Sequence, residues 1–107
     1  MDMKLPSVKR GDTFSLRVEL ADADGVPMNL TVGEVRSQVR NKRDQLVAEL
    51  VTTKVEDETG VFLLTALDTT GWETNDLYMD IEIEQDGVIT SSKTLIIPVV
   101  RDVTRYE

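Results

Sequence analysis

The chain has 107 residues, enough for one domain to bury a core without a disulfide or a bound metal. It contains no Cys and no His, which removes disulfide frameworks, thiolate zinc sites and the usual proton-transferring side chain of enzymes. Its formal net charge of −8 repels phosphate backbones and anionic lipids, so neither nucleic acid nor a membrane surface is an expected partner.

No targeting or membrane-spanning segment is expected. The start of the sequence lacks the basic and then apolar pattern of a secretory peptide. The longest apolar run, Leu95 to Val100, is too short to cross a bilayer. These features predict a soluble protein that is made and kept in the cytoplasm.

Alternation of apolar and polar residues predicts strands from the amino end onward. The first strand is expected from Thr13 to Leu20, followed by a turn at Asp22 to Gly25. The short run from Val26 to Leu30 contains Pro27, which indicates an edge or a bent segment.

The middle of the chain predicts two clear strands and one ambiguous segment. Gly33 to Arg40 alternates and is followed by a polar loop from Asn41 to Gln45. Leu46 to Val55 carries apolar residues on both faces, so its orientation stays open. After a turn at Glu56 to Gly60, the almost wholly apolar run Val61 to Ala66 predicts a buried strand.

The alternation breaks between Leu67 and Asn75. Asp68 or Thr69 could cap a single helical turn that carries Trp72. At most one short helical turn, near Thr69 to Glu73, is therefore expected.

The clearest hairpin comes last. Leu77 to Glu84 alternates, and Asp86-Gly87 is a strong signal for a two-residue turn. The chain returns from Val88 to Val100, and Asp102 to Arg105 either extends that strand or leads away. Seven or eight strands without a repeat or linker predict one all-β domain over residues 1–107, a two-layer antiparallel β-sandwich.

The inward faces of these strands supply the predicted core. Its members are Phe14, Leu16, Val18, Val35, Val39, Phe62, Leu64, Met79, Ile81 and Ile83.

Acidic residues are the only material for a catalytic or metal site. Asp22 and Asp24 with Gly25 resemble part of a calcium loop, but the later Glu that completes such a loop is missing. Glu56 to Glu58 is interpreted as an acidic turn. No catalytic, metal or cofactor-binding residue is therefore predicted, and we expect no enzyme.

The polar face of one strand carries Tyr78, Asp80, Glu82 and Glu84. Four such residues could bind a cation or a basic partner, or could form the solvated face of an antiparallel sheet. Arg10-Gly11-Asp12 matches a tripeptide of adhesion ligands, a match too short to support a function.

Two stretches are candidate interaction surfaces between protein chains. A basic cluster, which could dock an acidic patch or be ordinary surface, consists of Arg36, Arg40, Lys42 and Arg43. An apolar carboxyl-terminal run consists of Leu95, Ile96, Ile97, Val99, Val100 and Val103. Only one face of a strand packs on its own core, so this run either offers its other face to a partner or is covered internally. Pro98 suits an edge position.

An ordered series of short motifs spans nearly the whole chain. It begins with Arg10-Gly11-Asp12-Thr13-Phe14 and Gly25-Val26-Pro27-Met28-Asn29-Leu30-Thr31. It continues with Gln38-Val39-Arg40, Gly60-Val61-Phe62-Leu63-Leu64, Tyr78 and Asp80-Ile81, and ends with Asp86-Gly87, Thr90 and Asp102-Val103-Thr104-Arg105. The series resembles a family of small immunoglobulin-like proteins of tailed bacteriophages and prophages, similar to the amino-terminal domain of phage baseplate upper proteins.

The resemblance implies an immunoglobulin-like sandwich with a non-enzymatic structural role in a virion, as a tail, baseplate or head accessory protein. It implies assembly in the bacterial host cytoplasm, and contacts with other virion proteins and with copies of the chain itself. The competing hypothesis is an immunoglobulin-like recognition module for a cell-surface glycan or protein. Trp72, Tyr78 and the acidic strand face motivate it, the two aromatic residues because aromatic faces stack on pyranose rings.

Overall fold

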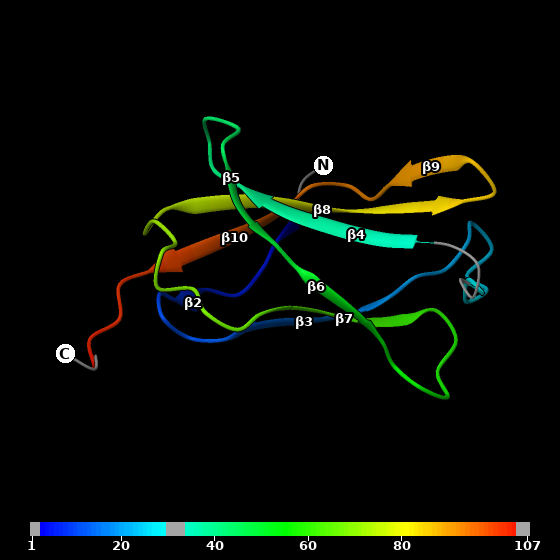
Figure 1. Ribbon diagram of the computed structural model, residues 1–107, viewed down its shortest axis with the longest axis horizontal. Helices are drawn as coiled ribbons and strands as arrows, with labels where there is room; N and C mark the ends of the chain where they lie inside the picture. Colours follow the sequence, from blue (N-terminus) through cyan, green and yellow to red (C-terminus); the bar gives the residue numbers. More distant parts are fainter. Residues whose placement is uncertain (1–2, 30–33, 105–107) are drawn as a thin grey trace.

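Two β-sheets make up the protein in a computed structural model (Figure 1). The structure describes residues 3–29 and 34–104, and within them no helix forms, so none is available to span a membrane. The all-β prediction is confirmed. Leu30, Gly33 and Arg105, which belong to three predicted segments, lie outside the described residues.

Three long strands form the middle of the larger sheet. β8 (Asp76–Gln85) lies between β10 (Leu95–Val100) and β4 (Glu34–Arg40), and both neighbours run antiparallel to it. β5 (Leu46–Glu49) pairs with the other side of β4. The strict alternation of these segments places one face of each strand toward the interior, as the sequence predicts.

Short strands complete the larger sheet. β1 (Met3–Lys4) and β2 (Val8–Lys9) both pair with β10, and they run parallel to it. β9 (Val88–Ser91) pairs with the half of β8 that β10 does not reach. The sheet is therefore mixed rather than wholly antiparallel, which corrects the prediction.

Pro98 does not mark an edge, because β10 has neighbours on both sides. The carbonyls of Ile96 and Val100 accept hydrogen bonds from the amino-terminal segment, at Leu5 (2.8 Å) and Arg10 (2.9 Å). Backbone groups alternate in direction along β10, so Pro98 also faces the amino-terminal segment. It faces the part of that segment between β1 and β2, which forms no strand pair with β10. The missing N–H therefore costs no ladder hydrogen bond.

The smaller sheet has three antiparallel strands in the order β3 (Phe14–Glu19), β7 (Val61–Ala66) and β6 (Val51–Lys54). The chain passes from the larger to the smaller sheet at the buried residue Leu50, between β5 and β6. The ambiguous segment is thus one crossing strand that serves both sheets.

The apolar residues of that crossing segment divide between core and surface. Val47, Ala48 and Leu50 contact the core, whereas Leu46 and Val51 are 50% and 64% exposed. The described residues form ten strands, against seven or eight predicted. β1 and β2 are not predicted, and the segments 46–55 and 88–100 each form two strands instead of one.

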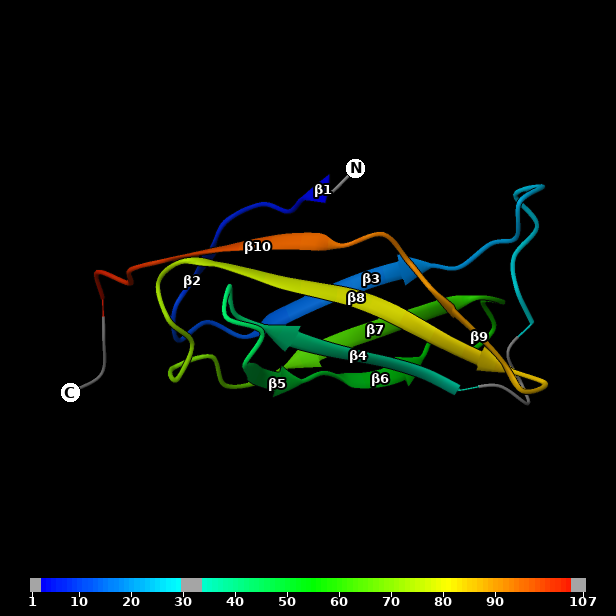
Figure 2. The ribbon, with the colours of Figure 1, turned by 90° about the horizontal axis from the view of Figure 1, so that it is seen from above.

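The core lies between the two sheets, which are separated in the view of Figure 1 and overlap when seen from above in Figure 2. All ten predicted core residues belong to the buried cluster or pack against it. Trp72, which the alternation leaves unassigned, is 3% exposed, and its ring centroid lies 5.6 Å from that of Phe14. It sits in a turn closed by the Trp72 N–H and the Thr69 carbonyl rather than in a helix.

Two predicted turns form as expected. Asp86 and Gly87 both have positive φ angles, 54° and 79°, as a two-residue hairpin turn requires. The Asp22 carboxylate accepts hydrogen bonds from the N–H groups of Asp24 and Val26, and Gly25 takes φ 80°. The Asp22 side chain therefore organises its own loop.

The hydroxyl of Thr69, a fully buried residue, joins two loops. It accepts a hydrogen bond from the Gly11 N–H (2.8 Å) and donates one to the Asp12 carbonyl (2.6 Å). Thr69→Val keeps the shape and leaves both backbone groups unpaired, so we expect a loss of about 1–3 kcal/mol of unfolding free energy in urea titrations. The exposed neighbour provides the control: Thr70→Val should stay within about 0.5 kcal/mol, and an equal loss in both variants would refute the joining role.

Candidate interaction surface

The outer face of the larger sheet gathers most of the polar residues that the sequence singles out. From β4 it receives Arg36, Gln38 and Arg40. Directly opposite them on β8, in the same order, are Glu82, Asp80 and Tyr78. Because the chain alternates, the core residues of the same strands point the other way. This outer face is the candidate interaction surface.

An ion cluster occupies one end of this surface. The Arg36 guanidinium contacts Glu34 at 2.7 Å, Glu82 at 2.6 Å and Glu84 at 3.0 Å. The hydrogen bonds that Arg36 donates to Glu82 and Glu84 raise the pKa of Arg36, which therefore stays charged. The predicted docking role of Arg36 would compete with these contacts, and the acidic strand face is partly neutralised from within the chain.

The rest of the basic cluster is also largely paired. Arg40 donates to the Asp44 carbonyl at 2.9 Å and to the Gln38 side chain at 3.0 Å. Arg43 reaches Glu73 at 3.9 Å. Of the four predicted residues, only Lys42 has no ion pair within residues 3–29 and 34–104.

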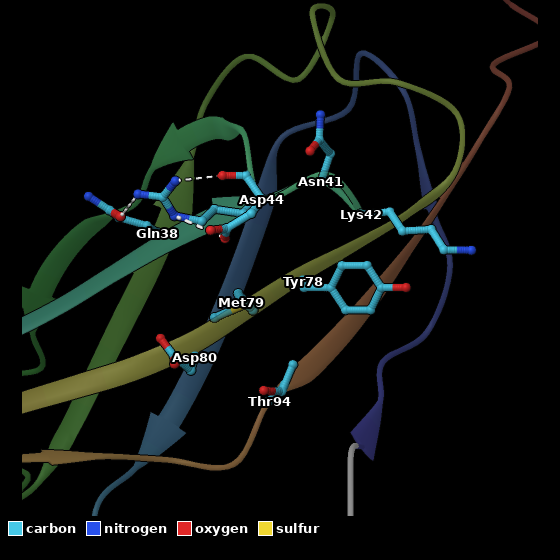
Figure 3. A pocket seen from close by; sticks show the side chains of 9 residues that line it. Gln38, Asn41, Lys42, Asp44, Tyr78, Met79, Asp80 and Thr94 are labelled. Atoms are coloured by element: carbon cyan, nitrogen blue, oxygen red, sulfur yellow. Dashed lines mark hydrogen bonds and ion pairs between the residues drawn. The ribbon is translucent and has the colours of Figure 1, made fainter.

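An open hollow of about 460 Å³ occupies the other end of the surface (Figure 3). Its walls come from the end of β4, the turn at residues 41–44, residues 78–80 of β8, and Thr94 before β10. Figure 3 shows the Tyr78 ring between Lys42 and Thr94, with Asp80 further along β8. Three segments distant in sequence thus form one hollow around an aromatic ring.

Four side chains of this hollow have no bonding partner in the part of the chain that the structure describes. They are the Lys42 ammonium, the Tyr78 hydroxyl, the Asp80 carboxylate and the Thr94 hydroxyl. Together they offer hydrogen-bond donors, an acceptor, both signs of charge and an aromatic ring. Such a set can contact a partner through hydrogen bonds, charge and aromatic surface.

The carboxyl-terminal run divides between the core and the surface. Ile97 and Val99 are buried, and Leu95 packs against the core, so these three residues do not form the predicted interface. The physical reason is that β10 lies inside the sheet and turns alternate residues inward. Ile96 lies opposite Tyr78 on the outer face. Val100 and Val103 are 39% and 72% exposed.

Two further predicted candidates take structural positions. Trp72 packs against Phe14 in the core, so its ring cannot stack on a ligand. Asp22 and Asp24 lie in a loop where the Asp22 carboxylate binds backbone N–H groups. No group of three or more Asp or Glu side chains among residues 3–29 and 34–104 is arranged to hold a metal ion.

Comparison with known proteins finds neither a family model nor a curated protein that matches the sequence. The resemblance to phage immunoglobulin-like proteins therefore rests on the short motifs. In the fold they occupy the entry to β3, the turn and strand at Gly60 to Leu64, and the hairpin turn at Asp86-Gly87.

Proposed function

We propose that this protein is a non-enzymatic structural component of a tailed-phage or prophage virion, built as an immunoglobulin-like sandwich and acting through protein–protein contacts. The motif series supports the virion assignment, and the two packed sheets are compatible with the implied architecture. Its place is the tail, the baseplate or the head, and its partners are other virion proteins and further copies of itself. Assembly takes place in the cytoplasm of the bacterial host.

The observation that carries the contact role is the hollow around Tyr78. Tyr and Arg are enriched among residues that dominate binding energy at protein interfaces. Here the Tyr78 ring is half-buried, and around it stand three polar groups that have no partner among the described residues. A partner that fills this hollow gains aromatic contact area and pairs both Lys42 and Asp80.

Particle composition tests the proposal. Virions purified from a host that carries the gene should contain the chain at a fixed copy number by quantitative mass spectrometry. Tyr78→Ala should reduce incorporation roughly tenfold or more, since central interface aromatics typically contribute about 2 kcal/mol or more. Absence of the unmodified chain from the particles would overturn the virion assignment.

A matched control separates the contact from the fold. Arg17 lies on the outer face of the smaller sheet and pairs with Glu19 and Glu58 while exposed. Arg17→Ala should therefore enter particles normally. Normal incorporation of Tyr78→Ala as well would move the contact away from the hollow. Both variants should keep the urea midpoint within the range of surface substitutions.

The hollow also favours a second candidate, the recognition module for a cell-surface glycan or protein. The Tyr78 ring, the Asp80 carboxylate and the Thr94 hydroxyl are suitable groups for a sugar. Titration with soluble oligosaccharides, followed by NMR at Tyr78, discriminates the two. Saturable changes in NMR chemical shift that Tyr78→Ala abolishes would favour glycan recognition. The absence of such changes would favour the structural role.

A further inference from the structure

β9 is an exposed edge strand. All four of its residues are exposed, including Val88 at 65% and Ile89 at 59%. Within the residues that the structure describes, β9 pairs only with β8, on the half that β10 leaves uncovered (Figures 1 and 2). Its other side presents the unpaired backbone groups that an edge strand offers to another chain.

The hairpin turn decides which backbone groups are unpaired. Asp86-Gly87 makes a two-residue turn, so the flanking pair Gln85 and Val88 exchanges hydrogen bonds across the hairpin. Alternation then directs the backbone of Thr90 toward β8 as well. The Ser92 N–H, which donates to the Ile81 carbonyl at 2.8 Å, fits the same alternation.

The N–H and carbonyl groups of Ile89 and Ser91 consequently point away from β8. They are the only residues of β9 with this orientation, because the strand ends at Ser91. Any chain that extends the sheet here must bond to these two residues.

Charge distinguishes this edge from the others. Val88 to Ser92 carries no charge, although 30% of the chain is charged. The other long edge strands carry charges that oppose close pairing with another strand: Arg17 and Glu19 in β3, Lys54 in β6 and Glu49 in β5. Charges return only at the ends of the uncharged stretch, with Asp86 on one side and Lys93 on the other.

We propose that β9 pairs antiparallel with β9 of a second copy of this chain, with Thr90 at the twofold axis. Ile89 then faces Ser91 of the second copy, and Ser91 faces its Ile89, so every outward backbone group of the strand is paired. If the register between the two β9 strands shifts by one residue, backbone groups that point away from β8 in one copy lie opposite groups that point toward β8 in the other. A shift that centres the pair on Ile89 or Ser91 leaves one outward residue of each strand opposite the turn or the stretch after β9.

The ends of this pairing are complementary in charge. Lys93 of one copy lies opposite Gly87 of the other and therefore next to its Asp86, and symmetry repeats this at the other end. The second copy is thus favoured over an arbitrary extended segment. A twofold contact uses the same strand twice and closes, so it gives a dimer rather than a filament. The inference rests on the proposed structural role and names one of its partners.

A single introduced cysteine tests the register, because the chain has no Cys of its own. Thr90 facing Thr90 is a pair without mutual hydrogen bonds, with Cα atoms about 4.5 Å apart, inside the range for a disulfide. With oxidised glutathione, Thr90→Cys should form disulfide-linked dimers roughly tenfold faster or more than Thr53→Cys, an exposed strand threonine on the smaller sheet. Equal rates would overturn the pairing.

A second variant tests the association without a covalent link. Ile89→Pro removes an outward N–H that makes no bond to β8, so the fold should persist while the pairing is lost. Sedimentation should show a dimer dissociation constant at least about tenfold weaker than that of the unmodified chain. A dimer of unchanged affinity would overturn the proposal.

The two proposals fail separately. If the chain is a virion subunit but Thr90→Cys crosslinks no faster than Thr53→Cys, the pairing of β9 is overturned and the virion role stands. If Thr90→Cys crosslinks faster and the chain is absent from particles, the virion role is overturned and the pairing stands.

Discussion

Leu64→Ala is expected to lower the free energy of unfolding by about 2–5 kcal/mol, the usual cost of removing a large side chain from a packed core. Leu64 is fully buried in β7, the central strand of the smaller sheet, where it lies between Leu16 on β3 and Thr52 on β6. The interior has no other group at that position to replace the lost contacts, so a cavity forms between the sheets.

Leu67→Ala is the matched control, because the same side chain is removed three residues further along. Leu67 is 78% exposed, and its loss should change the unfolding free energy by no more than about 0.5 kcal/mol. Urea titrations with a common slope measure both variants. Equal losses would mean that the inward face of β7 is assigned to the wrong residues.

Gly60→Ala should cause a loss of similar size by a different cause. Gly60 has φ 76°, and an added Cβ would lie 2.6 Å from the Leu20 carbonyl oxygen and 3.1 Å from the Met28 nitrogen. The left-handed backbone costs about 1–2 kcal/mol for a residue with a side chain, and forced displacement of packed backbone adds about 1–3 kcal/mol. We therefore expect a total of about 2–5 kcal/mol.

Gly25→Ala separates these two contributions. Gly25 has a similar φ of 80°, but an added Cβ there meets nothing within 4 Å. Its variant should lose only the backbone contribution of about 1–2 kcal/mol, measured in the same urea titrations. If both variants lose the same amount, the close approach of Gly60 to Leu20 has no energetic weight.

Local patterns were sufficient to predict most strands and turns. The alternation from Leu77 to Glu84 has one possible inward face, and the structure buries that face in β8. Asp86-Gly87 predicts the hairpin turn with equal specificity, because a two-residue turn needs positive φ angles at both positions and Asp-Gly adopts them readily. In each case the determining interaction lies within a few residues of the chain.

The features that local patterns do not predict depend on contacts between distant segments. β1 and β2 are two residues long and form only because β10, about ninety residues later, lies beside them. The pairing of Arg36 with Glu82 likewise follows from the register of β4 against β8. The hollow at Tyr78 needs the same register, so the sequence indicated the residue but not its surroundings.

The parallel pairing of the first strands with the last has a mechanical consequence. Hydrogen bonds at Met3, Leu5 and Arg10 join the amino-terminal segment to residues 94–100 along a common axis. A pull on the two ends of the chain draws these segments in opposite directions along that axis. All the bonds are then loaded together in shear instead of being peeled apart one after another, and the fold resists tension best in the direction in which its own chain would transmit it.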